Sequence, residues 1–306
     1  MGRYTSAFDS WEEQPVVIDA HHHLGQEKDY ADKLIDTMAK LGVDKTVLLA
    51  TGTSGPGSSN EQIEKVIKKH GDKLIGFGWV DPALDPNAVD TVQELYDSGF
   101  RGLKFIKTRK AYDDRSYLPT YQKAADLEMP ILFHQGIVAR HADDIANDVH
   151  SGRMMPVHLD YIARQVPELV MIGAHLGNPW WYEGGMVLRW NPNLYMDITG
   201  STLKMLAPED VGKILWWRRD SQYRDPWGRD AWEKIVFGTD VPYFLMEDVM
   251  NDYRNCMDVL GVPPDIQKGV WGDTMEKVLS YELSEKHRPF DDQGGHYPHA
   301  IPQDDK

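Results

Sequence analysis

Eight short apolar runs recur along the chain, and they constrain its fold more than any other feature. They are PVVIDAH from Pro15, KTVLLAT from Lys45, LIGFGWV from Leu74, FRGLKFI from Phe100, PILFHQG from Pro130, LVMIGAH from Leu169, LYMDITG from Leu194 and KIVFGTD from Lys234. Each run is short and carries few charges, which is typical of a parallel strand that is covered on both faces. The sequence therefore predicts eight buried strands.

Amphipathic segments lie between many of these runs and have the apolar spacing of helices. They are DYADKLIDTMAKLG, SNEQIEKVIKKHG, DPNAVDTVQELYDSG, MPVHLDYIARQVPEL and MEDVMNDYRNCMDVLG. Glycine closes the first three, and Ser59 and Asn60 are cap residues at the start of the second. We therefore expect helices to connect the strands.

Strands that alternate with helices form βαβ units and a parallel sheet. Eight such units in a chain of 306 residues favour a single closed (β/α)8 barrel, a TIM barrel. An open doubly wound sheet is the alternative. That fold more often carries a glycine-rich nucleotide loop after its first strand, and this chain has histidines there instead.

The barrel is expected to occupy residues 15–283, between an N-terminal extension (1–14) and a polar C-terminal tail (284–306) that is rich in Pro and Gly. We expect the tail to be an extended arm that packs on a neighbouring subunit, so that the chain forms a homo-oligomer, a dimer in the simplest case. Residues 178–190 and 216–232 hold seven of the ten tryptophans. These tryptophans pack either in the core or in the loop walls of a pocket or subunit interface.

The composition excludes several classes of protein. Hydrophobic residues make up 41% of the chain, which is enough for a large core and argues against disorder. A net charge of −15 repels phosphate backbones, so nucleic acid is not an expected partner. A single cysteine, Cys256, allows no intramolecular disulfide, and no secretory signal or apolar run of about 20 residues occurs. We expect a cytoplasmic protein with no membrane partner.

Polar side chains stand at the ends of five of the predicted strands. They are His21 and His23 on the first, Lys104 on the fourth, His134 on the fifth, His175 on the sixth and Asp240 on the eighth. In a (β/α)8 barrel these ends gather at one mouth, where active sites lie. The sequence therefore predicts one shared site.

The run of three histidines fits a metal site at this mouth. Side chains alternate along a strand, so His21 and His23 share a face while His22 points toward the helices. The pair lies only ~7 Å apart along the backbone, which lets both imidazoles reach one ion. Imidazole and carboxylate ligands suit Zn²⁺ best, with Mn²⁺, Fe²⁺ or Co²⁺ as alternatives. Asp19, expected on the face of His21, would accept a hydrogen bond from it.

The motifs DAHHHLG, GLKFI, FHQG, GAHLGNP and FGTDVPY together resemble the amidohydrolase superfamily over roughly residues 15–283. The most similar branch contains aminocarboxymuconate semialdehyde decarboxylase, γ-resorcylate decarboxylase and related hydrolases and hydratases. The resemblance implies one divalent ion held by His21, His23, His134 and Asp240. It also implies that Asp240 takes the proton of the metal-bound water and that His175 acts as an acid, a base or a polarising group.

Lys104 has two interpretations under this resemblance. In two-metal amidohydrolases a lysine on the fourth strand is carbamylated and bridges the ions, and His175 would then bind the second ion. In the more similar branch a lysine at this place is common without that role, and it would instead hold a substrate carboxylate. One ion is the expectation here, and a second ion bridged by modified Lys104 is the lesser alternative.

Further residues after the strand ends are candidates for binding a small-molecule substrate. Cationic side chains could grip a carboxylate, and aromatic ones could wall a planar molecule. The candidates are Lys104, Arg109, Arg115, Arg140, Tyr112, Trp180, Trp181 and Tyr243. Solvated surface charge and core packing are the competing explanations for them.

The expected function is metal-dependent hydrolysis of an amide, lactone or similar bond in a small molecule that carries a carboxylate. Nonoxidative decarboxylation of an aromatic or muconate-like acid is the main alternative, because ligand geometry alone does not separate the two reactions. An inactive barrel that serves as a binding protein is a third possibility. The complete set of ligands argues against it.

Overall fold

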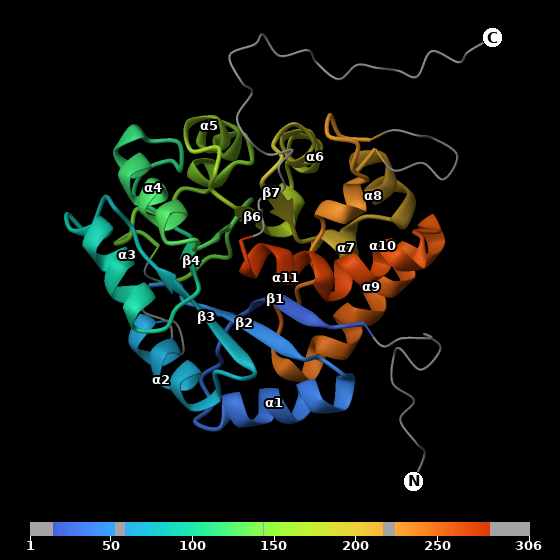
Figure 1. Cartoon of the computed structure of the whole chain (residues 1–306), viewed down its shortest axis with the longest axis horizontal. Helices are drawn as coiled ribbons and strands as arrows, with labels where there is room; N and C mark the ends of the chain where they lie inside the picture. The colour runs from blue at the N-terminus through green and yellow to red at the C-terminus, as the bar shows by residue number, and fades with distance from the viewer. Residues whose placement is uncertain (1–14, 53–58, 143, 217–223, 282–306) are drawn as a thin grey trace.

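Seven parallel strands lie side by side in one sheet, in the order in which they occur along the chain (Figure 1). The computed structural model describes residues 15–52, 59–142, 144–216 and 224–281, so the predicted extension and the predicted tail lie outside the described residues. The strands are β1 Ile18–His22, β2 Lys45–Leu49, β3 Leu74–Trp79, β4 Gly102–Phe105, β5 Ile131–Phe133, β6 Met171–Gly173 and β7 Leu194–Met196.

The eighth apolar run closes the barrel between β7 and β1, although it pairs only through a single bridge. The Val236 N–H donates to the Met196 carbonyl at 3.0 Å, and the Ala20 N–H donates to the Phe237 carbonyl at 2.9 Å. The ladder stops there because the N–H groups of Thr239 and Asp240 both turn to one acceptor, the carbonyl of His21. The prediction of a TIM barrel is confirmed, and the eighth strand is shorter than expected.

Helices surround this sheet, as Figure 1 shows. They are α1 Tyr30–Leu41, α2 Asn60–His70, α3 Ala88–Asp97, α4 Leu118–Asp126, α5 Val157–Gln165, α6 Trp181–Trp190, α7 Thr202–Met205, α8 Pro208–Ile214, α9 Met246–Leu260, α10 Pro264–Lys268 and α11 Thr274–Leu279. The five predicted helices correspond to α1, α2, α3, α5 and α9. Within the described residues, no helix combines the length and the apolar character that crossing a membrane requires.

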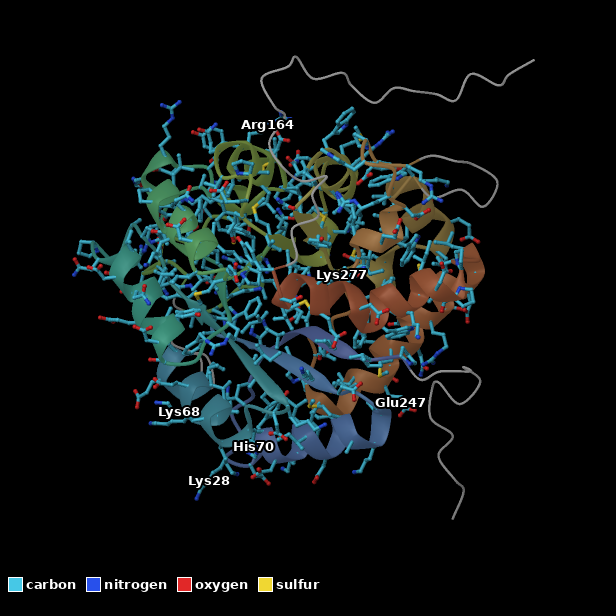
Figure 2. The ribbon with its side chains drawn as sticks, in the orientation of Figure 1. Lys28, Lys68, His70, Arg164, Glu247 and Lys277 are labelled. Atoms are coloured by element: carbon cyan, nitrogen blue, oxygen red, sulfur yellow. The ribbon has the colours of Figure 1, made fainter. Side chains whose placement is uncertain are left out.

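Local sequence explains where these helices begin and end. Ser59 caps α2 in a reciprocal capping box with Gln62, and Gly42 ends α1 in a left-handed conformation with φ of 74°. Charged side chains cover the outer surface, among them Lys68 of α2, Arg164 of α5 and Lys277 of α11 (Figure 2).

Two apolar layers hold the barrel together. The inner one gathers Ile18, Val47, Phe77, Leu132, Ile172 and Val236, and side chains of α11 join it from one end. The outer one lies between the sheet and the helices and includes the fully buried Trp232. Trp181 packs against the same layer, so core packing explains these two tryptophans, and Trp217 lies outside the described residues.

Tyr112 belongs to the outer layer, so core packing, one of the two explanations that the sequence left open, accounts for it. Its ring is fully buried beside Phe105 and Phe133, and its hydroxyl lies 2.9 Å from the carbonyl oxygen of His134. Tyr112 therefore holds the end of β5 from the side of the outer layer.

We expect Tyr112→Phe to lower the free energy of unfolding by about 1–3 kcal/mol, because the buried carbonyls of Phe105 and His134 lose the hydroxyl that contacts both of them. Urea denaturation of the variant and of Tyr182→Phe, whose ring is 68% exposed, measures this difference. Equal stability of the two variants would show that the buried hydroxyl contributes nothing.

Candidate metal centre

Three histidine side chains surround the carboxylate of Asp240 at the C-terminal mouth of the barrel. The Nε2 atoms of His21 and His23 lie 3.6 and 3.5 Å from its Oδ1. The Nε2 atom of His175 lies 3.7 Å from its Oδ2. Candidate ligand atoms of His21, His175 and Asp240 all lie within 4.8 Å of one another.

His134, the predicted ligand from the fifth strand, lies beside this group. Its ring centroid is 5.0 Å from that of His175, and its buried Nε2 atom has no hydrogen-bond partner within the described part of the chain. A buried nitrogen without a partner destabilises the folded protein, and a metal ion is one partner that would remove this cost. The structure thus brings together all five side chains that the sequence nominated as ligands or acid–base groups.

Fixed hydrogen-bond acceptors set the tautomers of two of the histidines. The Nδ1 atom of His21 lies 2.8 Å from Oδ2 of the buried Asp197. The Nδ1 atom of His23 lies 3.1 Å from the carbonyl oxygen of Leu49. A carbonyl or a carboxylate only accepts, so Nδ1 carries the proton in both rings. Each Nε2 atom then carries no proton and lies beside the Asp240 carboxylate.

The same reasoning applies to His175 through a hydroxyl group. The Thr199 hydroxyl donates its one proton to Oδ1 of Asp197 at 2.5 Å. Its oxygen therefore accepts from Nδ1 of His175 at 2.8 Å. His175, like His21 and His23, turns an unprotonated Nε2 toward the shared carboxylate.

The electrostatics keep these groups in the forms that bind cations. Burial lowers the pKa of His23 to about 3 and also lowers those of His134 and His175. Burial opposes ionisation of Asp240, but the surrounding basic side chains, first His21 and then His175, His23 and Lys104, favour the carboxylate in their protonated forms and lower the pKa of Asp240. The lowered pKa values favour neutral imidazoles at His23, His134 and His175 and an ionised carboxylate at Asp240, which are the protonation states that a metal ion requires of its ligands.

The pairing of β1 with β2 shifts register between Asp19 and His22, and the expected contact of Asp19 with the His21 ring does not form among the described interactions. Asp19 accepts from the backbone N–H of His21 at 3.1 Å and from the Thr239 hydroxyl at 2.6 Å, and it does not contact the His21 ring. The expected acceptor role belongs to Asp197 instead. His22 points to the helix layer as predicted, with Nε2 3.0 Å from the Tyr30 hydroxyl on α1.

Lys104 lies at the base of the histidine group. Its side chain is fully buried, and its Nζ is 3.4 Å from Nε2 of His21. Burial lowers its pKa to about 8. A buried amine in this position is close enough to the candidate ligands to act on whatever they bind.

The three arginines nominated for substrate binding lie on the loops after β4 and β5. The backbone N–H of Arg109 donates to Asp81 and its guanidinium reaches the carbonyl of Ala146 at 3.2 Å, while Arg115 and Arg140 are exposed. Trp180 directly precedes α6. No hydrogen bond or ion pair given for the described residues joins these four to the histidines, so their role in binding stays a prediction.

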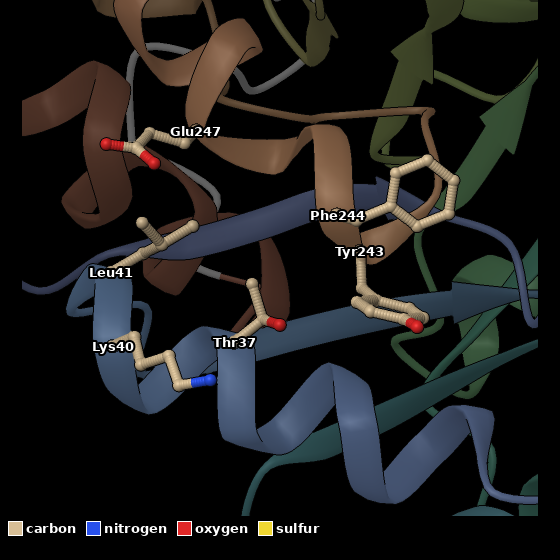
Figure 3. A pocket seen from close by; sticks show the side chains of 6 residues that line it. All are labelled: Thr37, Lys40, Leu41, Tyr243, Phe244 and Glu247. Atoms are coloured by element: carbon tan, nitrogen blue, oxygen red, sulfur yellow. The ribbon is translucent and has the colours of Figure 1, made fainter.

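Tyr243, nominated as a wall of the active site, instead faces α1. Its ring contacts that of Tyr30 at 5.2 Å in an edge-on arrangement. A cavity of about 310 Å³ lies there, lined by Thr37, Lys40, Leu41, Tyr243, Phe244 and Glu247 (Figure 3). None of these lining residues belongs to the histidine group.

Asp197 and Thr199 are the functional residues that the sequence reasoning missed. They stand in LYMDITG, the seventh apolar run, directly after β7. A carboxylate at a strand end was the same pattern that singled out Asp240, so the sequence did contain the indication.

The donor set fits a divalent metal ion. Three of the four imidazoles turn an unprotonated Nε2 atom toward the Asp240 carboxylate. The fourth, that of His134, has a buried Nε2 atom without a hydrogen-bond partner among the described residues. Nitrogen and carboxylate oxygen ligands are those of Zn²⁺ and of related first-row ions. A barrel with this group at its mouth has the form of a metal-dependent enzyme.

The chain belongs to the amidohydrolase family, whose family model matches residues 18–280. This confirms the resemblance drawn from the strand-end motifs, and enzymes of this superfamily are metal-dependent. No curated protein matches the chain significantly.

Solved structures share the fold at low identity. An uncharacterized TIM-barrel protein from Bordetella bronchiseptica aligns with a TM-score of 0.66 and 19% identity, covering 87% of this chain and 98% of that one. A 5-carboxyvanillate decarboxylase from Novosphingobium aromaticivorans, complexed with manganese, gives 0.61 and 14%, covering 90% and 98%. A probable 2-pyrone-4,6-dicarboxylic acid hydrolase from Acinetobacter baumannii gives 0.60 and 12%, covering 86% and 99%.

Proposed function

We propose that this chain is a metal-dependent hydrolase of a small molecule that carries a carboxylate. The observation that carries the proposal is the convergence on Asp240 of three imidazoles whose Nδ1 protons are all engaged elsewhere. His21, His23, His134 and Asp240 would hold one divalent ion, with His175 beside it. The proposed ion is Zn²⁺, and Mn²⁺ is the next candidate because a structural neighbour was solved with manganese.

The residues can manage the proton of a hydrolytic reaction. A bound divalent ion lowers the pKa of a coordinated water from about 15.7 to about 7 and polarises a substrate carbonyl. Asp240 is ionised and can accept the proton that the water loses. Its Oδ2 lies 3.7 Å from the unprotonated Nε2 of His175, which can receive that proton and donate it to the leaving group.

Lys104 supports the choice of a carboxylate-bearing substrate. Its amine is fully buried beside His21, and the charges of Asp240 and Asp197 only partly offset the burial that lowers its pKa. A buried ammonium is costly unless an anion pairs with it, and a substrate carboxylate would supply that anion. A carbamylated Lys104 that bridges a second ion is the lesser alternative.

Nonoxidative decarboxylation is the second candidate function, favoured by the likeness to 5-carboxyvanillate decarboxylase. In that reaction a proton is delivered to the ring carbon that bears the carboxylate. The bond from that carbon to the carboxylate breaks, its electron pair stays on the ring, and CO₂ leaves. Asp240 or His175, once protonated, can deliver this proton. The same five side chains therefore serve either reaction.

Product analysis separates the two functions. The protein, loaded in turn with Zn²⁺ and Mn²⁺, is incubated with carboxylated lactones, carboxylated amides and hydroxybenzoic acids. Appearance of ring-opened or amine products without CO₂ supports the hydrolase, and stoichiometric CO₂ supports the decarboxylase. Neither product from any substrate, together with no bound metal in the purified protein, would favour an inactive binding barrel.

We also propose that the chain forms a homodimer. We further propose that it binds no nucleic acid, because its net charge of −15 repels phosphate backbones. Light scattering of the purified protein measures the subunit count directly. A monomer at micromolar concentration would contradict the dimer.

A further inference from the structure

The carboxylate of Asp197 lies beneath two of the histidines and is fully buried. Its Oδ2 faces Nδ1 of His21 at 2.8 Å. Its Oδ1 accepts from the backbone N–H groups of His175 and Thr199 at 2.8 and 3.0 Å and from the Thr199 hydroxyl at 2.5 Å. Asp197 thus accepts hydrogen bonds from His21 on β1, from His175 after β6 and from Thr199 after β7.

We propose that Asp197 is a positioning residue that sets the tautomers of His21 and His175 together. It holds the His21 proton on Nδ1 directly, and it holds the His175 proton on Nδ1 through the hydroxyl of Thr199. Both Nε2 lone pairs are then available on the same side, facing Asp240. This inference deepens the proposed metal site and rests on it for its functional meaning.

The geometry makes this coupling specific. A neutral imidazole carries its proton on either nitrogen, and the partner of one nitrogen decides which. His23 has its own acceptor, the backbone carbonyl of Leu49, which no side-chain substitution at Asp197 removes. His23 is therefore an internal control for any change made at Asp197.

Asp197→Asn is a sharp test because asparagine has the same shape but only one accepting oxygen. Three donors surround the position of Oδ1, so the amide oxygen is expected to occupy it. The amide NH₂ then points at Nδ1 of His21, which must become an acceptor. The proton of His21 moves to Nε2 and blocks the lone pair that a metal ion would use.

Nuclear magnetic resonance of metal-free, ¹⁵N-histidine-labelled protein at about pH 8, where a histidine with the ordinary pKa of about 6.5 is neutral, reads the tautomers directly. In the wild type we expect His21, His23 and His175 to carry their protons on Nδ1. In Asp197→Asn we expect His21 alone to switch, because the amide oxygen still accepts from the Thr199 hydroxyl that fixes the tautomer of His175. In Thr199→Val we expect only His175 to lose its fixed tautomer, and this second variant keeps the inference testable if Asp197→Asn fails to fold.

Zinc affinity is the second readout, measured by competition with a chromophoric chelator. We expect Asp197→Asn to bind Zn²⁺ about 10–100-fold more weakly than the wild type. An Nε2-protonated His21 in the wild type, or an unchanged His21 tautomer in folded Asp197→Asn, would overturn the inference. Failure of the wild type to bind Zn²⁺ or Mn²⁺ would overturn the proposed function instead, because the tautomers are read without metal.

Discussion

Replacing Asp240 by asparagine is expected to lower kcat/KM by about 10²–10⁴-fold, the range that a positioned general base contributes. The amide cannot accept the proton of an attacking water, and it brings no negative charge to the three imidazoles around it. Asparagine also tolerates the left-handed backbone at this position, where φ is 49°. The fold should therefore survive, and steady-state kinetics with the substrate found by product analysis measure the loss.

Asp248→Asn is the matched control for this prediction. Asp248 lies in the first turn of α9, is exposed and undergoes the same change of charge. We expect its kcat/KM to equal that of the wild type. Near-wild-type turnover by folded Asp240→Asn would remove Asp240 from the chemistry and, with it, the proposed proton path to His175.

Removing the metal ion is expected to abolish turnover and to lower the thermal unfolding midpoint. An ion that binds only the folded chain stabilises it by about 4 kcal/mol when its free concentration is 1,000 times its Kd. Four buried or half-buried imidazoles lose a common partner when the ion leaves. Calorimetry before and after treatment with a chelator, followed by addition of Zn²⁺ or Mn²⁺, measures both effects.

The double variant His21→Ala, His23→Ala serves as the control for metal removal. It lacks the two ligands from β1, so added Zn²⁺ should leave its unfolding midpoint unchanged. Full activity of a wild-type preparation shown by mass spectrometry to be free of metal would contradict a metal-dependent mechanism.

The sequence predicted the barrel well because its evidence is repetitive. Alternation of apolar runs with amphipathic segments is a property of the whole chain, so the weak eighth pairing around Ile235 did not obscure the class of fold. The strand-end rule placed His21, His23, His134, His175 and Asp240 at one mouth, and in the structure these side chains lie next to one another. Their role as metal ligands stays a prediction.

What the sequence could not supply depends on local departures from regular geometry. The irregular β1 pairing turns Asp19 away from the His21 ring, and period-two reasoning has no means of anticipating an extra residue in a ladder. The hydrogen bond between His21 and Asp197 joins residues 176 positions apart, so no local sequence pattern indicates it. Tyr112 and Tyr243 follow strand ends as pocket residues do, but packing against neighbouring rings decided where they point.

X-ray absorption at the metal edge of the zinc-loaded protein tests most directly whether these histidines and Asp240 hold an ion. We predict a first shell of nitrogen and oxygen only, at about 2.0–2.2 Å, with the scattering pattern of at least two imidazoles. The double variant His21→Ala, His23→Ala should lose that pattern or the metal itself. An imidazole-free shell in the wild type, or identical spectra from both proteins, would show that the metal binds elsewhere.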